Sequence, residues 1–220
     1  MKQIIFSIAL TIFASSLQAG GFSLFHKGIK GSGDLKSETR QVDNFTRIKM
    51  VGAFDVFVTV GKEQSITLTF DDNLLDNILT EVQGKTLILE SEESYSSRKN
   101  CKIEITVPEL EYVKLSGSGD IVVSELNSDM FEYELSGSGD LTAEGKVKDL
   151  EINLSGSGDI DTHKLIAEDV YAKISGSGDI KVYASNRFDG KVSGSGDIVY
   201  YGNPKYTDKK VSGSGSIRER

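Results

Sequence analysis

One five-residue phrase, Ser-Gly-Ser-Gly-Asp, recurs through the C-terminal half of this 220-residue chain and limits what it can fold into. A sixth copy, Ser212–Ser216, ends in serine instead of aspartate. The five intact copies begin at Ser116, Ser136, Ser155, Ser175 and Ser193. The period is therefore 18 to 20 residues throughout residues 116–216. A nearly constant period of this length is typical of repeat architectures, in which each repeat packs only on its neighbours.

Apolar residues keep one phase through each repeat. In one repeat they are Phe131, Tyr133 and Leu135 before the phrase, and Leu141 and Ala143 after it, always an even number of positions apart. Even spacing indicates strand alternation, but one straight strand would be about twice the usual length of ~17–20 Å. The chain must therefore bend at Gly-Ser-Gly, where glycine accepts a positive φ and leaves no Cβ in the inner corner. We predict an all-β, single-domain β-solenoid with coils of about 19 residues.

The chain divides into three segments. Residues 1–19 are typical of a secretory signal peptide, with Lys2, an apolar stretch and a cleavage site after Ala19. A membrane anchor is the alternative, although the apolar stretch is short for one. Residues 20–41 form a leader or N-terminal cap with one early echo of the phrase, Gly31–Leu35. Residues 42–220 form the solenoid domain, with the regular coils over residues 116–216.

The first part of the solenoid keeps the pattern without intact phrases. Met50–Val58 can be aligned with Leu115–Val123, so we expect about three coils between them and about nine from Val42 to the end. The final segment, Ser216–Arg220, lacks the aspartate and gains charge. This predicts a cap against end-to-end addition of strands.

Composition excludes several classes of function. Acidic residues outnumber basic ones by 33 to 25, which argues against a nucleic-acid partner, because such partners select clustered Lys and Arg. The single cysteine, Cys101, cannot form an internal disulfide; it is either a small, partly buried strand residue, or a thiol that is reactive or forms an intermolecular bridge. No later apolar run is long enough to span a bilayer, so no transmembrane segment is expected in the mature chain.

Stacked coils would place the aspartate of each phrase in one outer column, about 4.8 Å apart. The column contains Asp120, Asp140, Asp159, Asp179 and Asp197. Adjacent carboxylates at that distance repel by about 3.5 kcal/mol at an effective dielectric constant of 20. We expect the carboxylates to accept backbone N–H groups at the glycine corner. The alternative is Ca²⁺ held between neighbouring carboxylates; otherwise we expect no metal and no cofactor.

A second column lies eight residues after the first serine of each phrase. It contains Ser124, Glu144, His163, Tyr183 and Tyr201. The last three would stack on one outer face, where aromatic rings and hydroxyls suit a sugar ring; ordinary cross-strand packing is the alternative. No catalytic residue is expected, because the chain has two histidines and only His163 lies in the repeats, where a nucleophile would need a base beside it.

Several segments carry a resemblance to a known family. Arg47–Val60, the step Val107-Pro108-Glu109-Leu110 and the serial Ser-Gly-Ser-Gly-Asp-Ile copies resemble the bacterial "putative auto-transporter adhesin, head GIN domain" family, a domain of unknown function. The resemblance covers about Val42 to the C-terminus. It implies a secreted, right-handed parallel β-helix with a homotrimer as one assembly, and it implies no enzymatic activity.

We therefore expect a secreted, non-enzymatic β-solenoid that acts as an adhesin-like surface or ligand-binding module of the bacterial envelope. A rigid rod with a repeated polar face suits many weak contacts made at once. The expected partner is a surface glycan or a protein, and the expected location is the periplasm or the cell surface. The rival interpretations are a structural envelope scaffold or homo-oligomer, and a carbohydrate-active enzyme.

Overall fold

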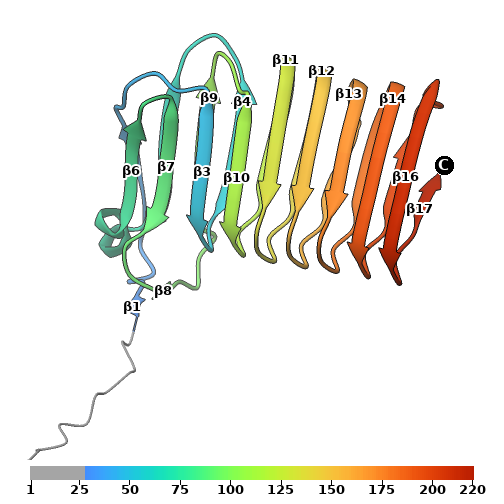
Figure 1. The fold of residues 1–220 in the computed structure, drawn as a ribbon. Helices are drawn as coiled ribbons and strands as arrows, with labels where there is room; N and C mark the ends of the chain where they lie inside the picture. The colour runs from blue at the N-terminus through green and yellow to red at the C-terminus, as the bar shows by residue number, and fades with distance from the viewer. Residues whose placement is uncertain (1–27) are drawn as a thin grey trace, which may run out of the picture.

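Most of the molecule is a stack of coils, and the strands of successive coils lie side by side in parallel (Figure 1). The computed structural model describes residues 28–220, which form 17 β-strands and one short 3₁₀ helix. Together they make a nearly all-β, single-domain β-solenoid of about five turns, which confirms the predicted fold class. The predicted signal peptide, residues 1–19, lies outside the described residues.

The repeat region supplies one long strand per coil. These strands are β11 (Ile121–Leu135), β12 (Leu141–Leu154), β13 (Ile160–Ile174) and β14 (Ile180–Gly194). The C-terminal end is completed by β15 (Ile198–Tyr201), β16 (Tyr206–Gly213) and β17 (Ile217–Glu219). Neighbouring strands pair in parallel, so that Leu135, Leu154 and Ile174 are successive partners. The phrases lie in the turns between the long strands, and the register shifts midway along several of these strands.

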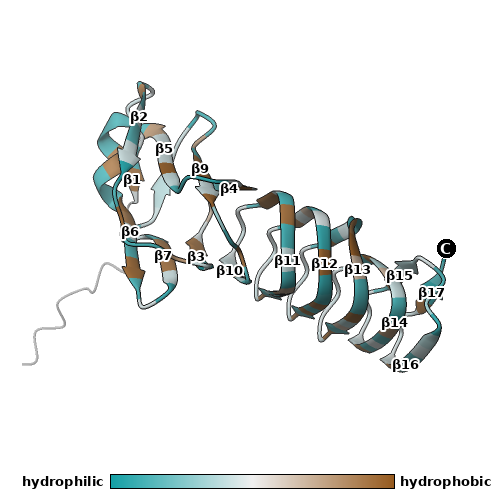
Figure 2. Ribbon diagram, turned by 90° about the horizontal axis from the view of Figure 1, so that it is seen from above, coloured by the Kyte–Doolittle hydropathy of each residue, from teal (hydrophilic) through white to brown (hydrophobic). Residues whose placement is uncertain are grey.

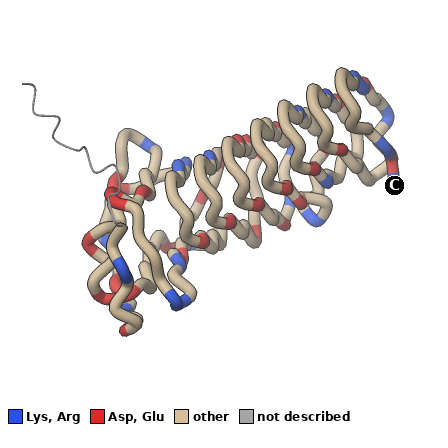
Figure 3. The backbone as a smooth tube through the Cα atoms, turned by 90° about the horizontal axis from the view of Figure 1, so that it is seen from below, with Lys and Arg blue, Asp and Glu red and all other residues tan. Residues whose placement is uncertain are grey.

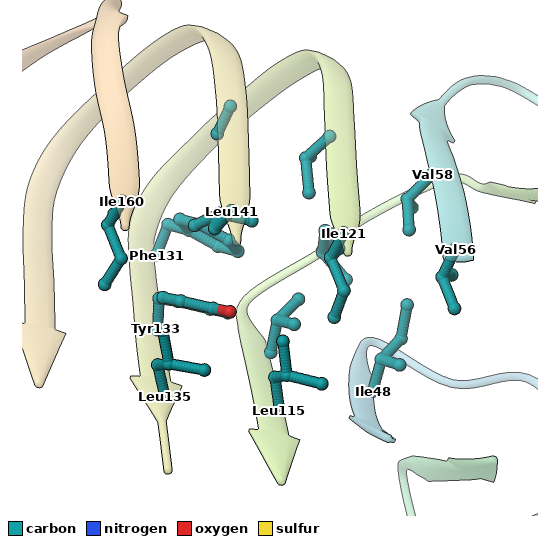
Figure 4. Packing of buried hydrophobic residues seen from close by; sticks show 14 of the residues in the cluster. Ile48, Val56, Val58, Leu115, Ile121, Phe131, Tyr133, Leu135, Leu141 and Ile160 are labelled. Atoms are coloured by element: carbon teal, nitrogen blue, oxygen red, sulfur yellow. The ribbon is translucent and has the colours of Figure 1, made fainter. Parts of the chain in front are cut away.

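The inward positions of successive coils form the core. Phe131, Tyr133 and Leu135 before a corner, and Leu141 and Ala143 after it, are at most 1% exposed, as strand alternation predicts. Figure 4 shows the larger of these side chains inside the coil, and Figure 2 shows hydrophobic and hydrophilic positions alternating along it. Complete burial of each large apolar side chain contributes about 1.5–3 kcal/mol, so the stack is stabilised coil by coil.

The glycines of the phrase are required by the distance between coils and not by their backbone angles. A Cβ on Gly156 would lie 2.0 Å from the carbonyl oxygen of Gly137 in the preceding coil, and one on Gly137 would lie 2.0 Å from that of Gly117. The described glycines with positive φ are Gly33, Gly84, Gly145, Gly202 and Gly213. Only the sixth copy of the phrase therefore has a left-handed glycine. The expectation that the corners need a positive φ is wrong, whereas the missing Cβ is essential.

The N-terminal part of the domain differs from the regular coils that we predict. β3 (Arg47–Gly52) pairs directly with β10 (Tyr112–Gly117), and β4 (Asp55–Val60) pairs directly with β11. Met50 is thus the register partner of Leu115. The two segments whose likeness suggested three coils between them are adjacent rungs, so the estimates of three intervening and nine total coils are wrong.

The residues between these rungs add further strands beyond the rung of β3 and β4, some of them parallel to that rung and some in antiparallel pairs. They form β5 (Ser65–Asp71), the 3₁₀ helix η1 (Asp72–Asn77), β6 (Ile78–Gln83), β7 (Thr86–Ser91), β8 (Tyr95–Ser96) and β9 (Lys102–Val107). β5 lies antiparallel to β9 and to β2 (Leu35–Arg40), and β6 lies antiparallel to β7. The tight turn from β6 to β7 places Gly84 at a φ of +65°, which favours glycine. Here a hairpin turn replaces the glycine corner, so the chain reverses instead of coiling.

Asp71, at the end of β5, anchors the beginning of the described chain. Its buried carboxylate accepts a hydrogen bond from the Gly33 N–H at 2.6 Å and another from the Ser97 hydroxyl. The bond from Ser97, which outweighs the effect of burial, holds the pKa of Asp71 below its ordinary value, and the Gly33 N–H adds to this. β1 (Ile29–Lys30) pairs with β8 next to this cluster. The incomplete copy of the phrase at Gly31–Leu35 is therefore held in place by a hydrogen bond to Asp71.

Charged residues occupy inward positions at the C-terminal end. Lys209 is the register partner of Gly190, and Glu219 that of Tyr200, both of which are buried. The Lys209 ammonium lies 4.5 Å from the centre of the Tyr200 ring, and Glu219 accepts a hydrogen bond from the Tyr200 hydroxyl at 3.1 Å. Tyr200 in turn stacks on Phe188, with the ring centroids 4.2 Å apart. Charges over an apolar end discourage a further strand from adding there.

We expect Gly156→Ala to destabilise the protein by about 4 kcal/mol or more. The new Cβ would lie 2.0 Å from the Gly137 carbonyl oxygen, and the coils would have to separate to accommodate it. Chemical denaturation followed by circular dichroism measures the effect. The control is Ser157→Ala at the exposed neighbouring position. Equal stability of the two variants would contradict the explanation by close approach of the coils.

We expect Asp71 to make stability dependent on pH in the acidic range. Because its folded-state pKa is lowered from 3.8, its stabilising effect is complete above that value and is lost as the pH falls through the folded-state pKa. Asp71→Asn should therefore lower Tm at neutral pH, and the difference from wild type should shrink under acid conditions. Melting curves across this range test it, with the exposed Asp76→Asn as control. A constant difference at every pH would oppose this role.

Candidate functional site

The aspartates of the phrase form a continuous hydrogen-bonded ladder. The backbone N–H of Asp159, for example, donates to Oδ1 of Asp140, one coil earlier, at 2.7 Å. The other carboxylates that accept the N–H of the following coil belong to Asp55, Asp120, Asp159, Asp179 and Asp197. The ladder ends at Ser216, whose hydroxyl also donates to the last carboxylate, at 3.0 Å. Figure 3 shows acidic positions repeating from coil to coil along the rod.

This bonding explains how the row of carboxylates is tolerated. A hydrogen bond from a backbone N–H to a carboxylate is charge-assisted and stronger than one between neutral groups, and solvent screens the exposed members of the row. Arg218 adds an ion pair to Asp197 at 3.2 Å. Within residues 28–220, no group of three or more His, Cys, Asp or Glu side chains is arranged to hold a metal ion. The Ca²⁺ alternative for this column stays a prediction.

The predicted aromatic column is formed only in part. Tyr183 and Tyr201 are register partners on β14 and β15. The His163 ring lies near the Tyr201 ring, with the centroids 5.6 Å apart and the planes at 39°. The register between β13 and β14 shifts just after Thr162, so His163 is not opposite Tyr183. The structure thus brings the three rings to one region, but not as a regular stack.

The remaining members of that predicted column lie elsewhere. Ser124 is the partner of Thr59 on β4, and Glu144 is the partner of Lys164 on β13. Register shifts after Val123 and after Thr142 separate these positions from the aromatic ones. A column drawn from constant sequence spacing therefore fails where strands bulge.

Asp161 orients the histidine and completes a small polar surface. Its carboxylate accepts a hydrogen bond from His163 Nδ1 and lies 3.5 Å from the Lys181 ammonium. Burial raises the pKa of Asp161, but the hydrogen bonds from His163 outweigh it, so the pKa lies below its ordinary value. We call Asp161, His163, Lys181, Tyr183 and Tyr201 the aromatic patch. It offers ring faces for stacking beside hydroxyl, ammonium and carboxylate groups for hydrogen bonds.

A second outer surface, which the sequence analysis did not single out, carries two columns of opposite character. It consists of outward side chains on the strand ends that precede each corner, the row of arrowheads in Figure 1. The first column contains Tyr112, Glu132, Glu151, Tyr171, Asp189 and Asp208. The second contains Lys114, Glu134, Asn153, Lys173, Lys191 and Lys210. We call this surface the charged face.

The charged face is shallowly hollowed and partly apolar. A hollow of about 310 Å³ is lined by Met130, Tyr171 and Asp189 among others, and one of about 270 Å³ continues from Tyr171 to Lys210. Met130 and Tyr171 are more than 40% exposed, as is Tyr206 at the end of the rod. A sequence signal for this surface did exist, because its two columns lie four and two residues before the first serine of each phrase.

The ladder predicts different effects for two substitutions of one aspartate. Asp159→Ala removes the acceptor for the Asp179 N–H and should cost about 1 kcal/mol. Asp159→Asn keeps an oxygen acceptor and should stay within about 0.5 kcal/mol of wild type. Denaturation curves of both variants measure this, and equal losses would argue against the ladder as the role of the carboxylate.

If Ca²⁺ binds the column, EDTA should lower Tm of the wild type and leave Asp159→Asn less affected.

Solved structures share this architecture. A crystal structure described as a putative adhesin from Bacteroides fragilis has 25% sequence identity and a TM-score of 0.70, covering 88% of this chain and 100% of its own. A crystal structure described as a putative lipid binding protein from Parabacteroides distasonis has 25% identity and a TM-score of 0.56, covering 87% and 99%. A putative adhesin from Parabacteroides merdae has 21% identity and a TM-score of 0.56, covering 87% and 98%.

None of the helical structure in residues 28–220 has the length and apolar character needed to cross a membrane.

Two further comparisons bear on identity. The comparison with curated proteins found no match to the chain. Residues 44–204 match the family model described as "Putative auto-transporter adhesin, head GIN domain". The match covers most of the chain and all of its intact Ser-Gly-Ser-Gly-Asp phrases. The chain therefore belongs to the head GIN domain family of putative auto-transporter adhesins.

Proposed function

We propose that this protein is a secreted, non-enzymatic, adhesin-like binding module of the bacterial envelope. The observation that carries the proposal is the family match over residues 44–204. Two solved structures at 25% identity add support, since they are described as a putative adhesin and as a putative lipid binding protein. The N-terminal sequence of residues 1–19 supports export by a signal peptide, to the periplasm or the cell surface.

The rod geometry suits a binding module. Coil backbones joined by continuous parallel ladders hold their outer side chains at fixed spacing, so that weak contacts can be made together without a large loss of conformational entropy. We infer that the aromatic patch is the ligand-contacting surface. His163, Tyr183 and Tyr201 present partly exposed rings, with Lys181 and Asp161 beside them. A glycan, or a protein surface carrying polar groups, fits such a patch.

The test is binding of the mature protein, residues 20–220, to an array of glycans and matrix proteins. We expect reproducible binding to one chemical class and a loss of at least about tenfold in affinity for Tyr183→Ala combined with Tyr201→Ala. The control is Phe57→Ala, which removes another exposed aromatic ring near the other end of the rod. Binding that survives the double substitution would exclude the aromatic patch as the site.

Three other outcomes would each change this interpretation. Silence across the array, together with a stable assembly in solution, would favour the structural scaffold. Turnover of a polysaccharide on the array would overturn the non-enzymatic proposal. Loss of binding with EDTA would revive the Asp120–Asp197 column as a Ca²⁺ site.

A further inference from the structure

In the two C-terminal coils of the charged face, an acidic residue of the first column lies beside a basic residue of the second. Asp189 lies two residues before Lys191, and Asp208 lies two residues before Lys210. Within one copy, Asp208 pairs with Lys210 at 2.9 Å and Asp189 pairs with Arg187 at 2.8 Å, so these charges are partly neutralised before two copies meet. Successive coils lie about 4.8 Å apart, and positions two residues apart on a strand lie about 6.7 Å apart. A ligand of a single sign would be attracted by one column and repelled by the other. The matching partner must itself carry both signs at these two spacings, as a second copy of this chain does.

Symmetry decides how two copies would fit. A two-fold axis parallel to the length of the rod, placed between the two columns, keeps each coil at its own height and exchanges the columns. The acidic column of one copy then faces the basic column of the other, coil against coil. A two-fold axis along the strands would instead place each column opposite itself, which like charges disfavour.

We propose that the charged face is a self-complementary surface through which two copies of this protein pair side by side, with their rods parallel. Asp189 then lies opposite Lys191 of the partner subunit, and Asp208 lies opposite the partner's Lys210. The surface is isologous, as two-fold assembly requires. It does not include the aromatic patch, so the pairing is independent of the proposed ligand site and would present two such patches.

The middle of the face adds apolar and polar contacts to these charge pairs. Tyr171, 41% exposed, would face the partner's Lys173, an arrangement that permits a cation–π contact. Glu151 would face the partner's Asn153; within one copy the Asn153 amide donates to Glu151 at 3.0 Å, and its second N–H can donate to the carboxylate of the other copy. The hollow beside Met130 and Tyr171 gives the opposing side chains room.

One coil of the face is unfavourable as it stands. Glu132 would lie opposite the partner's Glu134. Within each chain, however, Lys114 pairs with Glu134 at 2.6 Å. Burial, together with the charges of Glu151 and Glu134, already raises the pKa of Glu132 above its ordinary value. The repulsion in this coil is thus reduced by Lys114, and the favourable coils outnumber it.

The size of the face is adequate for a specific dimer. The strands from β10 to β16 extend it over about 25–30 Å, and the columns with their flanking positions cover about 20 Å. Each copy would thus bury about 600 Å², which is about 1,200 Å² for the two copies together. This total is close to the lower limit for specific interfaces, about 1,000–1,200 Å². We therefore expect a dimer of modest affinity that weakens as salt screens its charges.

The experiment measures the assembly of the mature protein by sedimentation velocity. The wild type should be dimeric at about 0.05 M salt and shift towards monomer at about 1 M salt. Lys191→Glu with Lys210→Glu should weaken the dimer by at least about tenfold, and so should Asp189→Lys with Asp208→Lys. An equimolar mixture of these two variants should form a heterodimer, because one now carries only acidic and the other only basic groups at the paired positions.

The matched control reverses two lysines on a different surface, Lys146→Glu with Lys148→Glu, and should leave the dimer intact. Melting curves of every variant confirm that it is folded. A wild type that is monomeric at low salt, or trimeric, would overturn the proposal. A dimer that survives both charge reversals, or variants that fail to pair when mixed, would overturn it as well. None of these outcomes depends on whether the array in the previous section detects a ligand.

Discussion

At each corner the backbone of one coil lies directly on the backbone of the next, with no side chain between them. Gly156 and Gly137 approach so closely that a Cβ would fall 2.0 Å from a carbonyl oxygen. This contact fixes the height of a coil, and the fixed height aligns equivalent side chains inside and outside. The packed core, the aspartate ladder and the two outer surfaces all depend on it, because each requires the same residue to recur at the same place in successive coils.

The regular coils were predictable because period and phase agree over several copies. The sequence alone indicates which side of each strand is buried, and Phe131, Tyr133 and Leu135 are indeed core residues. The N-terminal arrangement was not predictable in the same way. A strand in a hairpin alternates like a strand in a coil, so Ser65–Asp71 and Ile78–Gln83 give no sign that they pair antiparallel. Pairing partners are decided by turns such as that at Gly84, which a pattern of alternation does not describe.

The outer surfaces show the same limit at finer scale. Constant spacing predicted that Tyr183 and Tyr201 would be neighbours, and they are. It failed for His163, because the chain bulges after Thr162 and the register changes there. The charged face escaped notice for another reason. Its members differ in residue type from coil to coil, and only their charge follows a pattern, which becomes visible once register places acidic and basic columns side by side.

The aspartate ladder has a direction, and this has a consequence for the length of the rod. In each coil the aspartate carboxylate accepts a hydrogen bond from the following coil, and the aspartate N–H donates one to the preceding coil. Every coil is thus bonded like a unit in a polymer that grows in one direction. Ser216 donates to Asp197 through both N–H and hydroxyl but has no carboxylate to offer. The row of carboxylate acceptors therefore ends at this residue, and a further coil could not be bound in the way that the preceding ones are. Changes in rod length would therefore be easiest by duplication of internal coils, upstream of this terminating residue.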